Sequence, residues 1–146
     1  MTDHQGACVL VADDDAKLRD LICDMLGLAG FRTVLASDGA EVLDLAVRER
    51  PALILLDVLM PTMDGYTALA RLQGDPATRD IPTVMLTGRV EPIYRTLSAG
   101  MGAVAHLTKP FSFRALTETV RRSLEAACAA ELTGVAHEDT APLAVA

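Results

Sequence analysis

The sequence predicts an α/β fold, a doubly wound parallel sheet of five strands that alternate with five helices. Short unbroken apolar runs, such as residues 53–56, are typical of strands buried on both faces of a sheet covered by helices. Between these runs lie segments with apolar residues at helical spacing, which is the order expected for a parallel sheet. Several runs also end in polar residues, foremost Asp57, and open α/β sheets place their ligand sites at the carboxyl ends of strands.

Length and composition limit the range of functions. The 146 residues fit one domain, and a hydrophobic content of 51% is enough for a core. The net charge of −7 argues against direct nucleic-acid binding, since phosphate backbones favour Lys and Arg. We find no signal region and no apolar run of membrane-spanning length, so we expect no membrane contact and a cytoplasmic location. The three cysteines are widely spaced, so we expect neither a zinc site nor disulfides.

The first half of the chain contains two strands and two helices before the run at 53–57. A strand at 7–12 leads into an acidic triplet, and Asp15 is placed to cap a helix that Gly30 stops. A second strand follows at 31–36. Asp38 with Glu41 resembles a capping box, and the helix it opens extends to about residue 50, before Pro51. The apolar positions of the first helix are Leu18, Leu21, Ile22, Met25, Leu26 and Ala29.

The second half repeats the alternation. Ser112 is placed to cap the last helix, with Phe111 and Leu116 as a hydrophobic staple. After about residue 131 the pattern dissolves, so we expect one domain at 1–131 and a disordered tail or linker at 132–146. The expected elements are a strand at 53–57, a loop at 60–65, a helix at 65–73, a polar connection at 74–80, a strand at 81–86, a short helix near 92–99 and a strand at 103–107.

Polar residues stand at four strand ends: Asp13 and Asp14, Asp57, Thr87, and Lys109. Alone, each has an ordinary explanation, such as a helix N-terminus, a strand end or a surface lysine. Together, at one edge of a parallel sheet, they predict a pocket with three carboxylates, a hydroxyl and an ammonium. Close carboxylates repel one another unless a cation joins them. Mg²⁺ fits best, because it binds carboxylates, keeps waters and also binds phosphate oxygens.

These motifs resemble the receiver domain of two-component response regulators. The acidic pair lies in Val11–Asp14, and the phospho-acceptor strand and its loop lie in Leu55–Gly65. Leu86–Gly88 and Leu107–Phe111 resemble the two remaining family motifs. The resemblance extends from about Cys8 to Ala130. It implies the flavodoxin-like strand order 2-1-3-4-5 and a signalling protein that catalyses only its own phosphorylation and slow dephosphorylation.

The resemblance also implies a role for each residue of the pocket. Asp57 would accept a phosphoryl group from a histidine kinase or a histidine phosphotransfer protein. Asp14, Asp57 and the backbone carbonyl of Leu59 would hold Mg²⁺, and Asp13 would act mainly through water on the metal. Lys109 and Thr87 would offset the charge of the phosphoryl group, which agrees with the needs of phosphoryl transfer.

Phosphorylation would then repack the face formed by the helix near 92–99, the strand at 103–107 and the last helix, and so control a protein target or an output domain. The family also pairs through this face, which leaves a homodimer open, although we find no patch that predicts one. A cis peptide is implied at Lys109–Pro110.

Three positions depart from the family pattern. The switch position, usually Tyr or Phe, is His106, which predicts either a smaller switch that still moves or a weakened one. Leu59 and Arg89 occupy the positions that tune the lifetime of the phosphoryl group, and we predict slow hydrolysis because Leu59 cannot orient a water. Val104 and Ala105 replace the polar pair that the family often has just before the switch position. This makes the segment more apolar and indicates a contact surface on that face.

Two alternatives differ in class from a working receiver. A phosphatase of the haloacid dehalogenase type also uses an aspartate at a strand end, but it needs a second aspartate at the position of Leu59 as a general acid. An interaction module with vestigial phosphorylation remains open. The sequence does not identify the kinase, the target or the oligomeric state, nor whether the chain works alone or as part of a longer protein.

Overall fold

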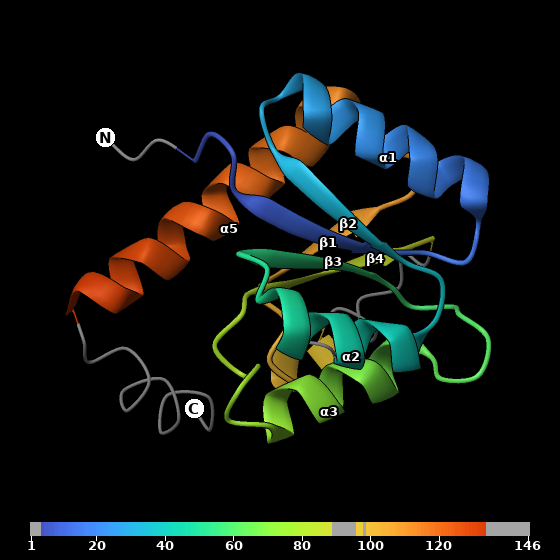
Figure 1. The fold of residues 1–146 in the computed structure, drawn as a ribbon, viewed down its shortest axis with the longest axis vertical. Coiled ribbons are helices and arrows are strands. Elements are labelled where there is room, and N and C mark those ends of the chain that lie inside the picture. Colours follow the sequence, from blue (N-terminus) through green and yellow to red (C-terminus); the bar gives the residue numbers. More distant parts are fainter. Residues whose placement is uncertain (1–3, 89–95, 98, 134–146) are drawn as a thin grey trace.

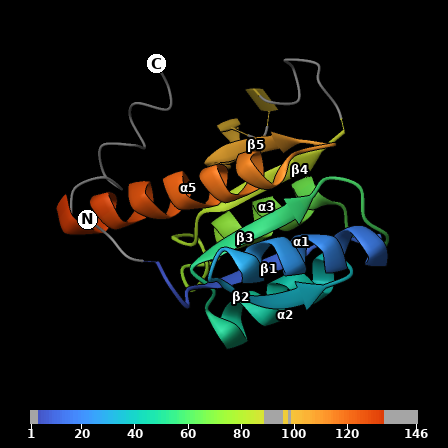
Figure 2. The same cartoon turned by 90° about the horizontal axis from the view of Figure 1, so that it is seen from above.

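The computed structural model describes residues 4–88, 96–97 and 99–133. It contains a five-stranded parallel sheet in the order β2-β1-β3-β4-β5, as predicted (Figures 1 and 2). The central strand is β3, in which Ile54 pairs with Leu10 on one side and Thr83 on the other. The strands are β1 (Cys8–Ala12), β2 (Arg32–Ala36), β3 (Leu53–Asp57), β4 (Thr83–Thr87) and β5 (Ala105–Thr108).

Helices cover both faces of this sheet. One face is covered by α1 (Ala16–Leu28) and α5 (Phe113–Thr133), the other by α2 (Gly39–Glu49) and α3 (Gly65–Gly74) (Figure 1). Of the short helix expected near 92–99, residues 96–97 and 99 are helical, as is residue 100, and the remainder lies outside the described residues. Four helices of the predicted five therefore have defined bounds.

The apolar run of β3 explains the two-faced core. Residues 53–56 have no solvent exposure. Their side chains alternate, with Leu53 and Leu55 in the cluster under α1 and α5, and Ile54 and Leu56 in the cluster under α2 and α3. This confirms that a short unbroken apolar run marks a strand buried on both faces.

Local hydrogen bonds confirm the predicted helix starts. The Asp15 carboxylate accepts from the backbone amides of Lys17 and Leu18 at the start of α1, and the hydroxyl of Ser112 accepts from the amide of Ala115 at 3.0 Å. Asp38 likewise accepts from the amide of Glu41 at 2.9 Å. The return bond differs from a standard capping box, because the Glu41 carboxylate accepts from the amide of Ser37, one residue before the cap, at 2.7 Å.

Some element bounds differ from the prediction. β4 begins at Thr83 rather than at 81, since Pro82 has no N–H for the ladder and contributes only its carbonyl, which accepts from the amide of Ile54 at 2.9 Å. β5 spans 105–108 rather than 103–107 and is only partly buried, as an edge strand. α5 continues to Thr133, two residues past the expected end of the ordered domain.

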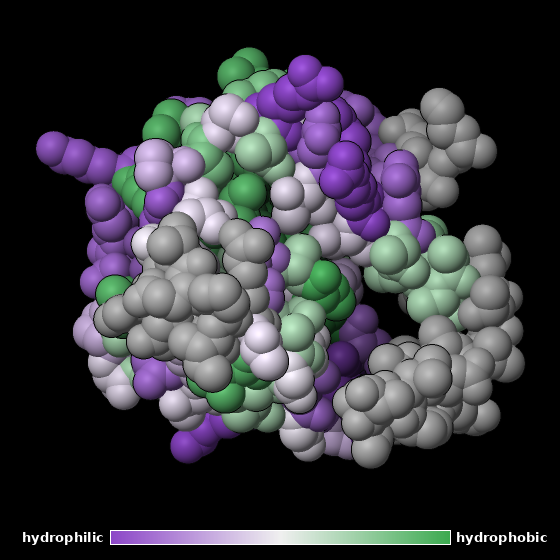
Figure 3. Space-filling view, turned by 180° about the vertical axis from the view of Figure 1, so that it is seen from behind, coloured by the Kyte–Doolittle hydropathy of each residue, from purple (hydrophilic) through white to green (hydrophobic). Residues whose placement is uncertain are grey.

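The length of α5 also shapes the molecule. Its 21 residues give a rod of about 31 Å, while a five-residue strand spans only about 17 Å. Its C-terminal half therefore projects past the sheet (Figures 1 and 2). On the face seen in Figure 3, hydrophobic residues are interspersed with hydrophilic ones. Among the described residues, we find no helix with the length and apolar character needed to cross a membrane.

Candidate functional site

The carboxyl ends of the strands bring together the residues that the sequence singled out. Asp13 follows β1, Asp57 ends β3, Thr87 ends β4 and Lys109 follows β5. These four side chains, with Asp14 and Leu59, line one cleft. Asp13, Asp57 and Thr87 are at most 5% exposed, whereas Asp14 is exposed to solvent. The predicted pocket is therefore assembled, with two buried carboxylates and one accessible carboxylate.

The ammonium of Lys109 lies between the two buried carboxylates. Its Nζ is 2.9 Å from Asp13 Oδ2 and 3.1 Å from Asp57 Oδ1. Charge-assisted hydrogen bonds of this length are strong when water is largely excluded. Lys109 thus supplies a cation that offsets the repulsion between Asp13 and Asp57.

One lysine does not neutralise the whole site. Burial and the negative charge of Asp13 raise the pKa of Asp57 from 3.8 to about 6, although the ammonium of Lys109 and the backbone N–H of Leu59 lower it in part. Burial alone would lower the pKa of Lys109, but the hydrogen bonds and charges of the same two carboxylates together raise it, so the ammonium stays charged. The cleft therefore favours additional positive charge close to Asp57.

The donor set fits a hard divalent cation. Asp13, Asp14 and Asp57 each place a carboxylate oxygen within 4.8 Å of the others. Oxygen ligands of this kind suit Mg²⁺ or Ca²⁺, and an exposed carboxylate beside a buried one leaves room for bound water. This group of residues could hold such an ion, and the raised pKa of Asp57 gives the site an electrostatic reason to bind it.

The main chain around Asp57 is held by the loop that follows it. The amide of Gly65 donates to the carbonyl of Val58 at 2.8 Å, which closes the loop onto the end of β3. A Cβ at Gly65 would overlap the carbonyl oxygen of Asp57. The prediction included Gly65 in the loop motif but missed this close approach, which becomes visible only when α3 is placed against β3.

A second residue that the sequence analysis missed is Arg19. It lies in the first turns of α1, and its Nη1 donates to the backbone carbonyl of Asp13 at 2.8 Å. Its position four residues after the Asp15 cap places it near the acidic loop. However, an arginine at such a position is common on a solvated helix face, so the sequence alone gave no reason to select it.

The remaining predicted positions are placed as follows. His106 lies on β5, partly buried and paired in register with Met85 of β4. Leu59 is 65% exposed at the cleft. The peptide between Lys109 and Pro110 is cis, as the family resemblance implied. Arg89, the other position predicted to tune the phosphoryl lifetime, lies outside the described residues.

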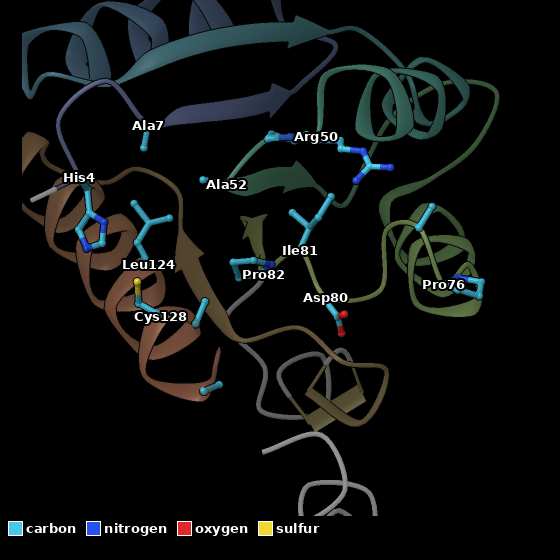
Figure 4. Close-up of a pocket in the computed structure, with 14 residues that line it drawn as sticks. His4, Ala7, Arg50, Ala52, Pro76, Asp80, Ile81, Pro82, Leu124 and Cys128 are labelled. Atoms are coloured by element: carbon cyan, nitrogen blue, oxygen red, sulfur yellow. The ribbon is translucent and has the colours of Figure 1, made fainter. Parts of the chain in front are cut away.

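Another pocket lies at the opposite end of the strands (Figure 4). It is formed where the segments leading into β3 and β4, with Ala52 and Pro82, meet the second half of α5 at Leu124 and Cys128. It contains none of the predicted site residues. Asp13, Asp14, Asp57, Thr87 and Lys109 thus all lie away from this pocket, in the cleft at the carboxyl ends of the strands.

Comparison with known proteins agrees with the fold and the cleft. Residues 9–121 match the family model of the response regulator receiver domain. The chain belongs to this family. It is therefore related to signalling proteins of two-component systems.

Among curated relatives, the DNA-binding dual master transcriptional regulator RpaA of Synechocystis is 38% identical over 80% of this chain and 48% of its own length. The transcriptional regulatory protein CpxR of Escherichia coli is 37% identical over 80% of this chain and 48% of its own length. The chain thus spans about half the length of the curated relatives it matches.

Two solved structures resemble it along almost their whole length. The chemotaxis protein CheY4 of Vibrio cholerae has a TM-score of 0.77 and 31% identity, covering 81% of this chain and 98% of its own. The receiver domain of the sensor histidine kinase PA1611 of Pseudomonas aeruginosa has a TM-score of 0.77 and 28% identity, covering 82% of this chain and 98% of its own. That structure has a magnesium ion coordinated in its active site cleft.

Proposed function

We propose that this receiver domain is a phosphorylation switch in which Asp57 accepts a phosphoryl group in a Mg²⁺-dependent reaction. The donor is a phosphohistidine on a sensor histidine kinase or a histidine phosphotransfer protein. The observation that carries the proposal is the position of the Asp57 carboxylate, 3.1 Å from the Lys109 ammonium, in a cleft shared with Asp13 and Asp14. A nucleophile, a fixed cation and two further carboxylates together fit phosphoryl transfer better than a purely structural role.

In the transfer step, an oxygen of Asp57 attacks phosphorus as the P–N bond to the histidine breaks. The bonding electron pair returns to the imidazole nitrogen, which takes up a proton from solvent. Lys109 stays close to the charge that develops on the phosphoryl oxygens, and the hydroxyl of Thr87, at the end of the neighbouring strand, can donate to one of them. When bound, Mg²⁺ supplies further positive charge to these oxygens.

The metal ligands would be Asp14, Asp57 and the backbone carbonyl of Leu59. Asp13 would act mainly through water, which agrees with its existing contacts, since one of its oxygens accepts from Lys109 at 2.9 Å and the other from the amide of Asp15 at 2.9 Å. The magnesium found in the related PA1611 receiver domain supports the choice of ion.

The output would follow from the added charge. A phosphoryl group on Asp57 brings new acceptors to the cleft, and Thr87 would shift toward it. His106 lies on β5 and Lys109 follows it directly, so such a shift can reach the surface that β5 and α5 would form with the helix expected near 92–99. We expect this surface to bind a protein target or an output domain, or a second copy of the chain. We expect no direct contact with nucleic acid or membrane, and a cytoplasmic location.

The first test is the intact mass of the protein after incubation with Mg²⁺ and acetyl phosphate. The wild type should gain one phosphoryl group and Asp57→Asn none. Asp64→Asn is a matched control, because Asp64 is an exposed helix cap at which asparagine caps equally well. It should be phosphorylated like the wild type.

Each result separates the proposal from its alternative. Phosphorylation that needs Mg²⁺ and is abolished only by Asp57→Asn would support the switch. A folded wild-type protein that gains no mass would favour an interaction module with vestigial phosphorylation, and His106 would then be the first residue to examine.

A further inference from the structure

We infer that Arg19 is a positioning residue for the divalent cation, because it fixes the main chain of the acidic loop at 13–15 from which Asp14 reaches the cleft. The inference rests on the metal site of the proposed function. It adds a residue of α1 that the carboxylate pattern alone does not indicate.

The first step is the set of contacts made by Asp13. Its amide donates to the carbonyl of Ala36 at 3.2 Å, and its carbonyl accepts from Arg19 Nη1 at 2.8 Å. Its two carboxylate oxygens accept from the amide of Asp15 and from Lys109 Nζ, each at 2.9 Å. Each polar group of this buried residue is therefore engaged, and only the contact to its carbonyl comes from a side chain of α1.

The second step is the geometry of the peptide that joins Asp13 to Asp14. A peptide group is planar, so the direction of the Asp13 carbonyl fixes the direction of the Asp14 amide and limits the position of its Cα. Arg19 is also attached to the other end of the loop, since its own amide donates to the carbonyl of Asp15 at 2.9 Å. The side chain of Arg19 is thus bonded to Asp13 and its backbone to Asp15. Asp14 lies between these two residues.

The third step separates this role from simple packing. Arg19 Nε is buried, and the structure gives it no hydrogen-bond partner among the described residues. A buried N–H without a partner costs free energy, and a methionine of similar length would avoid that cost. The guanidinium is therefore poorly suited to stability alone, but it suits a loop that must hold Asp13 and Asp14 close to Asp57.

Metal affinity in the absence of any phosphodonor tests the inference. We would titrate Mn²⁺, a paramagnetic substitute for Mg²⁺, into the wild type, Arg19→Met and Arg19→Lys by electron paramagnetic resonance at 10 °C. Circular dichroism would confirm that each variant is folded. Arg122→Met is the matched control, because it removes an arginine whose side chain is 80% exposed on α5.

We expect Arg19→Met to weaken Mn²⁺ binding by about tenfold, the usual effect of losing a residue that orients a metal ligand. Arg19→Lys should recover part of the loss, and Arg122→Met should bind like the wild type. The amide of Asp15 should also exchange its hydrogen faster in metal-free Arg19→Met, since its acceptor on Asp13 is less fixed.

A folded Arg19→Met protein with Mn²⁺ affinity within twofold of the wild type would overturn the inference. If Arg19→Met does not fold, wild-type affinity in Arg19→Lys together with unchanged exchange at Asp15 would overturn it as well. A wild-type protein that binds no Mn²⁺ would instead overturn the metal site of the proposed function, so the two failures are distinguishable.

Discussion

The ammonium of Lys109 and the carboxylate of Asp57 form an ion pair of 3.1 Å between residues 52 positions apart in the sequence. The pair reaches over β4, the strand that lies between β3 and β5. Asp57 is 5% exposed, so removing its partner would leave a buried charge poorly compensated.

Replacing Lys109 with methionine should therefore destabilise the metal-free protein at neutral pH. We expect a loss of about 3 kcal/mol in the free energy of unfolding, the range found when one partner of a buried ion pair is removed. Thermal unfolding at pH 7.5 in EDTA measures it. Lys17→Met, on an exposed turn of α1, is the control and should change little. Equal unfolding temperatures for the two variants would contradict the importance of the ion pair.

Asp57→Asn should have the opposite effect. The pKa of Asp57 is raised from 3.8 in the unfolded chain to about 6, so the folded state favours the protonated, neutral carboxyl. The stability that comes from this neutral form is fully present below pH 3.8 and is lost as the pH rises through 6. Asparagine does not ionise, so the variant keeps that contribution at pH 7.5. We expect its unfolding temperature without metal to exceed that of the wild type by at least ~2 °C, or about 1 kcal/mol. The difference should shrink as the pH falls and vanish below pH 3.8, and a difference independent of pH would refute this account.

The same raised pKa predicts pH-dependent metal binding. A carboxylate must lose its proton to bind a cation, and Asp57 is largely protonated at pH 5. The apparent affinity for Mg²⁺ should therefore fall about tenfold between pH 7.5 and pH 5. Isothermal titration calorimetry at both pH values measures this change. Proton release on binding should be greater near pH 6 than at pH 8, and a flat profile would argue against Asp57 as a ligand.

Gly65→Ala tests the close approach of α3 to Asp57. The added Cβ would overlap the carbonyl oxygen of Asp57, so either the loop or the end of β3 must move. We expect a loss of about 3 kcal/mol in stability and slower phosphorylation by acetyl phosphate. At Gly74, at the other end of α3, an added Cβ would meet nothing within 4 Å apart from its chain neighbours and the backbone of its own helix, so Gly74→Ala should be neutral or slightly stabilising. Similar behaviour of the two variants would count against the proposed contact.

Leu59 should set a long lifetime for phospho-Asp57. It is 65% exposed at the cleft and has no polar group to orient an attacking water. We expect the phosphoryl group to persist for minutes in Mg²⁺, and Leu59→Asn to shorten its half-life by about tenfold. The decay of the phosphorylated mass with time measures both values. A half-life of seconds in the wild type would show that this reasoning is wrong.

The strand ends were predictable from the sequence because apolar runs and their terminal polar residues are local patterns. Residues 53–56 are fully buried, and Asp57 stands at the predicted end of that strand. The contacts between side chains from different strand ends were harder to predict. A strand pattern places Lys109 at the correct edge of the sheet, but not in contact with both Asp13 and Asp57, because that depends on the directions of side chains from three separate strands.

The different environments of Asp13 and Asp14 were also beyond a local pattern. The two residues are adjacent and chemically identical, yet Asp13 has no exposure and Asp14 is exposed. Their difference comes from the turn of the main chain into α1, which Arg19 holds through the carbonyl of Asp13. The exact end of β4 was not predictable from a local pattern either. The strand was predicted to end at 86 but ends at Thr87, because its bounds depend on pairing with β3 and β5.

The overhang of α5 would turn a small motion near the cleft into a larger one far from it. The helix starts just after Ser112, three residues from Lys109, and ends at Thr133 beyond the opposite edge of the sheet. For a rod of about 31 Å, a tilt of about 5° at Ser112 displaces the far end by about 3 Å. This distance is comparable to a hydrogen bond and is sufficient to make or break a contact. A tilt that starts beside the cleft would therefore be amplified along α5 toward Thr133.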